Sequence, residues 1–265
     1  MTGPTVLTSG GNSSANGQAS VVVSALDVPS GSAVYVAVGQ AQGTGSTVTG
    51  VTDTNGNTYT RAVQSPSGFV TTFDVWHAEN VVGGASTDVT VAYTGNESTT
   101  VVVVVVQGQA AQSLGTIGTA TNFSTSATSF ATTMTTTKAN ALVLSITALL
   151  RLTGAVTFPP PYVSVNASDS ASLAGNVESD SIPSPGPTTA TIDTGDSTTG
   201  CGICIEVDPP GGPAVAGAAG VFGATGTPVG QLVFSAARWL PRLIWRMFPR
   251  RRRAVPTAIA RPAVR

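Results

Sequence analysis

Residues 98–109 read STTVVVVVVQGQ, in which six consecutive valines stand between polar residues. Valine is enriched in strands, so this stretch predicts a strand over Thr99–Gln107. Successive side chains of a strand point to opposite faces of its sheet, and here both faces are apolar. Because only one face of a strand meets the core of a two-sheet sandwich, the second valine face needs a cover of its own.

The second valine face is therefore a candidate interface. If the odd-numbered valines face the core, then Val102, Val104 and Val106 require a partner subunit or an apolar arm, since an uncovered valine strand is prone to aggregate. We predict a subunit or partner interface at these three residues. The alternative is a partly exposed face whose valines serve only strand propensity.

The composition favours extended structure throughout the body of the chain. The 265 residues are 41% hydrophobic and 9% charged, against roughly 25% charged in typical soluble domains. From residue 18 to residue 208, short apolar runs alternate with Gly, Pro and Asn, which is the pattern of an all-β antiparallel sandwich. The expected strands are Ser20–Leu26, Ala33–Gly39, Ser46–Asp53, Thr58–Val63, Thr71–Ala78, Asp88–Tyr93, Thr99–Gln107, Ser129–Thr135, Ala141–Leu149, Tyr162–Ala167, Ser172–Asn176, Thr188–Asp193 and Gly200–Val207.

Two local patterns refine this architecture. Within VTDTNGNTYT, Asn55–Gly56 predicts a two-residue hairpin turn, because Asn-Gly supplies the positive φ angles that such a turn requires. The two halves also look like weak copies of each other, since residues 83–106 align with residues 186–207 and Pro29–Val36 aligns with Thr137–Leu144. The halves would form one sandwich or two abutting ones, divided near residues 110–128.

Charge is divided sharply along the chain. All 13 acidic residues lie at or before Asp208, against three basic residues, Arg61, Lys138 and Arg151, so this part carries a net charge of −10. The residues after Asp208 include nine arginines and no acid, a net charge of +9. We expect a flexible N-terminal segment (1–17), a sandwich body (18–208), a Gly/Ala/Pro linker (209–228) and a basic arm (229–265).

The arm has the pattern of a basic amphipathic helix. Arginines recur every fourth residue from Arg238 to Arg250 among large apolar residues, while Pro241 predicts a kink or a helix start and Pro249 an end. Tryptophan, phenylalanine, methionine and arginine are enriched in protein interfaces. The arm residues predicted to contact a partner are Arg238, Trp239, Arg242, Leu243, Trp245, Arg246, Phe248, Arg250, Arg251, Arg252 and Arg253.

The sequence offers little for catalysis or metal binding. His77 is the single histidine, and the G-x-S-x-G, H-E-x-x-H and P-loop motifs are absent. On one strand, Cys201 and Cys204 would face opposite sides, which disfavours a disulfide or shared metal and predicts two buried thiols. The DTNGN sequence from Asp53 resembles the start of a calcium loop, but its glycine is misplaced and Gln64 stands at the twelfth position, so a turn is the better interpretation. We expect no enzyme and no cofactor.

Three motifs lie between residues 48 and 93: a D-x-x-G-N-x-Y turn, a V-W-x-A-x-N strand end and a following T-V-T-V type of strand. Together they resemble a β-sandwich unit that recurs in bacteriophage virion proteins and bacterial surface proteins. The resemblance spans residues 18–208 and implies a structural or binding module without a catalytic signature. The matching positions are Asp53, Gly56, Asn57, Tyr59, Trp76, Ala78 and Asn80.

These observations predict a non-enzymatic virion structural protein, such as a bacteriophage capsid decoration or tail-surface component, that docks through its basic arm. The expected partners are further copies of the chain or another virion protein with an acidic surface. One alternative is a bacterial surface or carbohydrate-binding adhesin module that contacts glycans, and another is a peripheral membrane protein anchored by the arm. Nucleic acid is less favoured, because the acidic body would repel phosphate.

The first 20 residues contain neither a basic segment nor an apolar one. This pattern disfavours a secretory signal peptide. We therefore expect the protein to be made in the host cytoplasm and to be located in the virion.

Overall fold

The computed structural model describes residues 3–14, 18–41, 46–66, 71–95, 98–150, 156–169 and 173–211. Strands make up the regular structure of these residues, and all their pairings are antiparallel. The predicted all-β sandwich class is thereby confirmed. The basic arm and most of the linker lie outside the described residues.

The first half of the chain forms two sheets that enclose one core. Sheet A has the strand order β1 (Thr5–Ser14), β8 (Thr99–Gln107), β3 (Ala33–Ala41), β6 (Thr71–Ala78) and β5 (Thr60–Gln64). Sheet B has the order β2 (Ser20–Val28), β7 (Gly84–Thr94) and β4 (Thr47–Asp53). Valines of β2, β3, β4, β7 and β8 fill the space between the two sheets.

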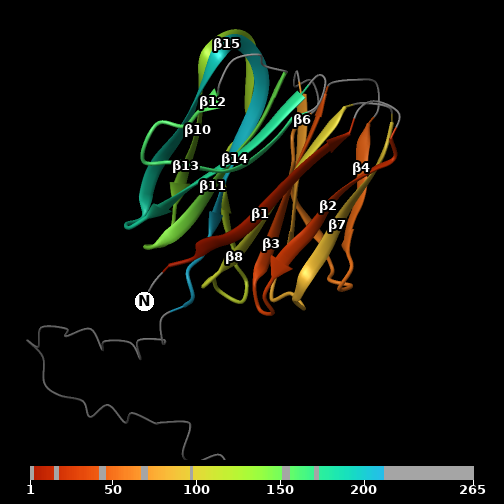
Figure 1. Ribbon diagram of the computed structural model, residues 1–265. Coiled ribbons are helices and arrows are strands. Elements are labelled where there is room, and N and C mark those ends of the chain that lie inside the picture. The colour runs from red at the N-terminus through yellow and green to blue at the C-terminus, as the bar shows by residue number, and fades with distance from the viewer. Residues whose placement is uncertain are drawn as a thin grey trace, which may run out of the picture. The chain divides into compact units, whose positions relative to one another are not determined.

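The second half forms sheet C, which lies beside sheet A in Figure 1. Its main order is β10 (Thr121–Thr136), β15 (Gly186–Val207), β11 (Ala141–Leu150), β14 (Leu173–Ile182) and β13 (Val163–Asp169). Two short strands, β9 (Leu114–Ile117) and β12 (Val156–Thr157), also pair with β15.

Sheet C folds back on itself because β10 and β15 are long and β10 carries irregular pairing near residues 123–129. Thr132 of β10 consequently contacts Ser145 of β11 and Cys204 at the far end of β15, although β10 and β11 are not paired. Sheet C is thus a second sandwich, and the body consists of two abutting sandwiches.

The strand pairings of the second sandwich repeat those of the first. In the first half, β8 lies between β1 and β3, and β7 lies between β2 and β4. In the second half, residues 205–207 of β15 lie between β9 and β11, whereas residues 186–193 pair with β10 and residues 193–194 with β12. The orders β3-β6-β5 and β11-β14-β13 correspond as well. One bent strand, β15, therefore takes the places of both β7 and β8.

The valine strand β8 is buried on both faces within its own chain. Val101, Val103 and Val105 belong to the core between sheets A and B. The interface predicted at Val102, Val104 and Val106 is wrong, because these residues pack in the core between sheets A and C, against apolar residues of β11 and β15. The second half of the chain is the cover that the sequence required.

Two further expectations need correction. Residues 1–17 are not a flexible segment throughout, since Thr5–Ser14 forms β1 and pairs with β8 along its length. This pairing satisfies backbone groups that the edge of the valine strand would otherwise expose. Asn55–Gly56 does not close a hairpin, because β4 belongs to sheet B and β5 to sheet A. The turn instead carries the chain from one sheet to the other.

We expect Val104→Thr to lower the free energy of unfolding by about 1–3 kcal/mol, because it places a hydroxyl in an apolar core without changing the shape of the side chain. Urea denaturation of the full-length protein measures the change. Val82→Thr is the control, since this side chain is 63% exposed and its change should stay within about 0.5 kcal/mol. A change of oligomeric state without loss of stability would contradict the internal placement of Val104.

Candidate functional site

Among the described residues, the predicted interface is represented only by its three valines. The three even-numbered valines are interior, and the arm residues from Arg238 to Arg253 lie outside the described part of the chain. What the described residues do form is a set of polar clusters at the seams between sheets. Each cluster is centred on a carboxylate.

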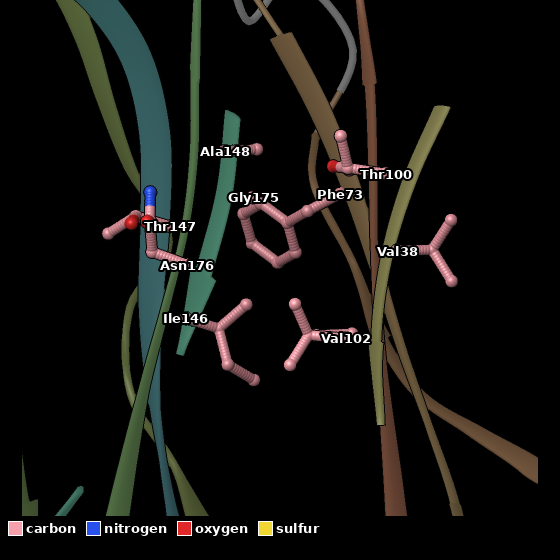
Figure 2. Close-up of a pocket in the computed structure, with 11 residues that line it drawn as sticks. Val38, Phe73, Thr100, Val102, Ile146, Thr147, Ala148, Gly175 and Asn176 are labelled. Atoms are coloured by element: carbon pink, nitrogen blue, oxygen red, sulfur yellow. The ribbon is translucent and has the colours of Figure 1, made fainter. Parts of the chain in front are cut away.

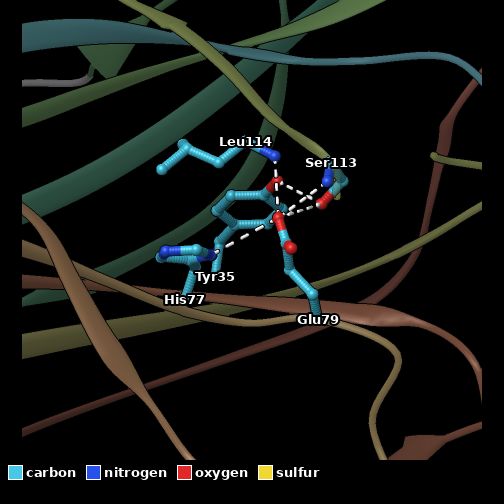
Figure 3. Close-up of polar contacts among 5 residues, drawn as sticks. All are labelled: Tyr35, His77, Glu79, Ser113 and Leu114. Atoms are coloured by element: carbon cyan, nitrogen blue, oxygen red, sulfur yellow. Dashed lines mark hydrogen bonds and ion pairs between the residues drawn. The ribbon is translucent and has the colours of Figure 1, made fainter. Parts of the chain in front are cut away.

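The first cluster joins the two sandwiches. Glu79 follows β6, and its Oε1 accepts hydrogen bonds from the backbone N–H groups of Ser113 (2.7 Å) and Leu114 (2.9 Å) and from the Ser113 hydroxyl (3.3 Å). The Ser113 hydroxyl also pairs with the hydroxyl of Tyr35 on β3, at 2.8 Å. Figure 3 shows these groups converging on the beginning of β9. Glu79 therefore fastens the connection between the halves to sheet A.

The same cluster contains the single histidine and superficially resembles a catalytic triad. His77 Nδ1 lies 3.6 Å from Glu79 Oε1, and its ring stacks on Tyr35. However, the Ser113 hydroxyl bonds to Glu79 and Tyr35, and Ser113 is fully buried, so it is neither activated by the imidazole nor open to a substrate. Burial lowers the pKa of His77, with Glu79 acting in the opposite direction. The arrangement fits a neutral, structural histidine.

A second carboxylate organises the same end of the second sandwich. Glu206, near the end of β15, is buried and accepts hydrogen bonds from the backbone N–H groups of Thr116, Thr137 and Lys138 and from the Thr137 hydroxyl. Burial alone would raise the pKa of Glu206, but these donors outweigh it and lower the pKa below its ordinary value. Glu206 thus stays ionised while holding the turn before β11.

The end of β15 is held at this junction. The Asp208 N–H donates to the Ser113 carbonyl at 2.7 Å, and the Ala110 N–H donates to the Asp208 carbonyl at 3.0 Å. Gly3 packs so closely on the Asn140 carbonyl that a side chain there would collide with it. The first described residues, the connection between the halves and the end of β15 therefore meet at one end of the body.

The motif residues of the first sandwich also have structural roles. Asp53 accepts hydrogen bonds from the N–H groups of Asn55 and Asn57, from the Asn57 amide and from the Tyr59 hydroxyl. Asn57 in turn bonds both the N–H and the carbonyl of Val82. Gly56 has a φ of 75°, which glycine adopts at little cost. The motif builds the crossover from sheet B to sheet A and docks it on the loop after β6.

An ion pair closes the other side of the first sandwich. Arg61 on β5 lies 3.0 Å from the Asp74 carboxylate, donates to the Val48 carbonyl of β4 and stacks over Trp76 with 4.8 Å to the ring centre. Burial raises the pKa of Asp74 to about 6, although the Arg61 charge partly offsets this. Arg61 links the edge of sheet A to sheet B and compensates a buried acid.

We expect Arg61→Met to destabilise the protein by about 2–4 kcal/mol at pH 8, because Asp74 is left buried without its counter-charge. The pKa of Asp74 is already raised in the folded chain, so its ionisation costs stability as pH rises, and the loss should shrink at pH 5. Denaturation at the two pH values measures this. The Arg61→Met/Asp74→Asn double variant should recover most of the loss, and an equal loss at both pH values would contradict the pairing.

We expect Asp53→Asn to cost about 1–3 kcal/mol, because the new amide presents a donor to the donors of Asn57 and Tyr59. Thermal unfolding, with and without added calcium, is the measurement. Asp27→Asn is the matched control on an exposed aspartate. A calcium-dependent rise in the Tm of the unaltered protein that Asp53→Asn abolishes would instead support a cation at this turn.

The two cysteines behave as the strand geometry predicts. Cys201 packs in the core between sheets A and C, and Cys204 packs inside the second sandwich, on the opposite face of β15. Both are free thiols and buried. Burial raises the pKa of Cys201 to about 12 and that of Cys204 to about 11, so both stay protonated. No set of three or more ligating side chains that could hold a metal occurs in the described ranges.

The cavities are small or featureless. Between sheets A and C, a space of about 10 Å³ lies among Phe73, Thr100, Val102 and Ile146, as Figure 2 shows. A shallow hollow of about 420 Å³ outside β10 and β15 is lined by threonines, glycine, Ile117, Met134 and Pro187, without charged or aromatic groups. Another, of about 210 Å³, lies beside Pro4, Asn140 and Ile182. None of these three spaces presents an aromatic platform for a sugar ring.

The comparisons with known proteins add no relative: the chain matches no family model, no curated protein and no solved structure. In the part of the chain that the structure describes, no helix has the length and apolarity needed to cross a membrane. The conclusions about function therefore rest on the sequence and on the geometry above.

The carboxylate clusters were missed at the level of sequence. Glu79 stands at a variable position of the V-W-x-A-x-N motif, and Ser113 and Tyr35 carry no local signal. Glu206 does have a local signal in the sequence, because a single acid inside the apolar run CGICIEV indicates a buried carboxylate that must find hydrogen-bond donors. Such partners come from distant parts of the chain.

Proposed function

We propose that this protein is a non-enzymatic virion structural component, a bacteriophage capsid decoration or tail-surface protein, that attaches through its basic C-terminal arm. The observation that supports this most directly is the structural use of the polar groups: Asp53, Asp74, Glu79 and Glu206 each tie strands or loops together. A body built in this way suits static display.

Because the valines pack inside the chain, we assign the contact with a partner to the arm alone. Val102, Val104 and Val106 bind the chain's own second sandwich, so they are not available to another subunit. The arm combines tryptophan, phenylalanine and methionine with nine arginines after Asp208. Apolar burial of these side chains would provide affinity, and the arginines would set orientation and speed of association.

The location of the acidic residues indicates what kind of partner the arm meets. Asp74, Glu178 and Glu206 are buried, and Asp53 and Glu79 are engaged in hydrogen bonds within loops. The net charge of −10 therefore overstates the acidity of the body's surface. This favours a separate acidic virion protein as partner over a second copy of the same body.

The alternatives receive less support. A glycan-binding module needs exposed aromatic rings, whereas the tyrosines of the body and Phe73, Phe123 and Phe130 are buried. Trp76 is partly covered by Arg61. The alternative of a membrane anchor is supported only by the amphipathic sequence pattern of the arm. An experiment can distinguish binding to a membrane from binding to a protein partner.

Co-sedimentation of the full-length protein with purified virions or with anionic vesicles tests the proposal, alongside a variant in which Arg250, Arg251, Arg252 and Arg253 are all serine. We expect both to have the same body stability, and only the unaltered protein to sediment with purified virions or their acidic shell protein. Binding to anionic vesicles but not to virions would favour the membrane alternative. Equal virion binding by both proteins would contradict docking through the arginines.

A further inference from the structure

The interior of the second sandwich is divided by a layer of polar side chains. On β11, Val143 and Leu149 belong to two separate apolar clusters, and the inward residues between them are Ser145 and Thr147. The inward face of β3 in the first sandwich carries Val34, Val36 and Val38, and a polar residue, Gln40, only near the end of the strand. We call this layer the polar belt; its members are Thr132, Ser145, Thr147, Asn176 and Glu178, all of them buried.

The polar belt contains a carboxyl group without a counter-charge. Glu178 lies on β14 and is 2% exposed, and the hydroxyl of its pairing partner Ser145 hydrogen-bonds to it. Its Oε2 has no hydrogen-bond partner among the described residues, and the same holds for Thr147 Oγ1 and Asn176 Nδ2. Arg61 is committed to Asp74 in the other sandwich, and Lys138 is exposed on the turn before β11. Neither of these described cations pairs with Glu178.

An isolated carboxylate is among the most costly groups to bury, and proteins usually neutralise it instead. We infer that Glu178 is carried as a neutral carboxylic acid in the folded chain, so that losing this proton as pH rises loosens the second sandwich more than the first. The inference is independent of the proposed virion role. It concerns a proton-binding site built into the fold.

The electrostatic surroundings point in the same direction. Burial raises the pKa of Glu178 to about 7, and the hydrogen bond from Ser145 only partly offsets it. The titratable groups facing it are Asp180 of β14, Tyr162 before β13 and Cys204 of β15, while β10 and β11 present uncharged Thr132, Ser145 and Thr147. Burial also raises the pKa of Tyr162 and Cys204, so both stay neutral. The pKa of Asp180 is raised by burial as well.

The sign of the effect follows from linkage. A carboxyl group whose pKa is higher in the folded chain than in the unfolded chain binds its proton more tightly when folded, so its contribution to stability is present at low pH and is lost as pH rises. For Glu178 the loss runs from its ordinary value of 4.5 to about 7. This corresponds to at least a tenfold and at most about a 300-fold rise in the unfolding equilibrium constant.

The direct test is a carboxyl titration by NMR on full-length protein carrying ¹³C-labelled glutamate. The chain has four glutamates, Glu79, Glu97, Glu178 and Glu206, so the resonances can be assigned by single substitution to glutamine. We expect one resonance to titrate near pH 7 and to vanish in Glu178→Gln. If all four titrate below about pH 5.5, the inference is overturned, whether or not any variant folds.

The second test measures stability and local opening between pH 5 and pH 9. Glu178→Gln keeps the shape of the side chain without its charge, so its stability should exceed that of the unaltered protein at pH 8 and should lack the fall between about pH 5 and pH 7. Asp180→Asn is the matched control and should keep that fall. Transfer of the effect to Asp180→Asn would overturn the assignment to Glu178.

Amide hydrogen exchange separates the two sandwiches in the same experiment. The pKa of Asp74 in the first sandwich is also raised by burial. A measurement of global stability alone therefore combines the effects of Asp74 and Glu178. We expect exchange in β11 and β14 to accelerate between about pH 5 and pH 7, beyond the intrinsic change, more than exchange in β2 and β7. Equal acceleration in all four strands would contradict a local effect at the polar belt.

Discussion

The double burial of β8 is the constraint on which the rest of the structure depends. A strand of six valines cannot leave either face in water, and its edges carry backbone groups that must be paired. Sheet B covers one face and sheet C the other, while β1 and β3 pair with its two edges. The two sandwiches therefore share an apolar core, and neither half has its full set of apolar contacts without the other.

Polar side chains hold the loops that connect the sheets in defined positions. The apolar cores are non-directional, but Glu79, Glu206 and Asp53 each collect several donors from a loop that would otherwise leave N–H groups unpaired. These carboxylates specify where the chain crosses between layers. Because such carboxylates are used internally, part of the net charge of −10 on residues 1–208 is not displayed on the surface. Glu178 is the exception, since it has no set of donors to hold its charge.

Much of the strand arrangement was predictable, because it follows from local pattern. The bounds of β6 and β8 agree with the sequence-based expectation, since both strands are rich in β-branched and aromatic residues. β1 was missed because TVLTSGGNSS lacks an apolar face and contains two glycines; its order comes from its neighbour. The turn at Asn55–Gly56 was recognised but assigned to the wrong connection, since local turn chemistry does not say which sheet the next strand joins.

The candidate sites were harder to foresee for the same reason. Whether a carboxylate is solvated, hydrogen-bonded or buried alone depends on strands far away in sequence, as with Glu79 and Ser113 or with Glu178 and Ser145. The cover of the even-numbered valines was likewise a long-range question. Periodicity correctly indicated that a cover exists, and only the folded chain identified it as residues of β11 and β15.

The pairing at the end of β15 has a mechanical consequence. The last residues of β15 are paired with β11 on one side and with β9 on the other. A pull applied at Asp208 along the axis of β15 would load the cross-strand hydrogen bonds of these ladders together in shear instead of peeling them one at a time. A body tethered at this point would resist detachment of its own strands while drag acts on the remainder.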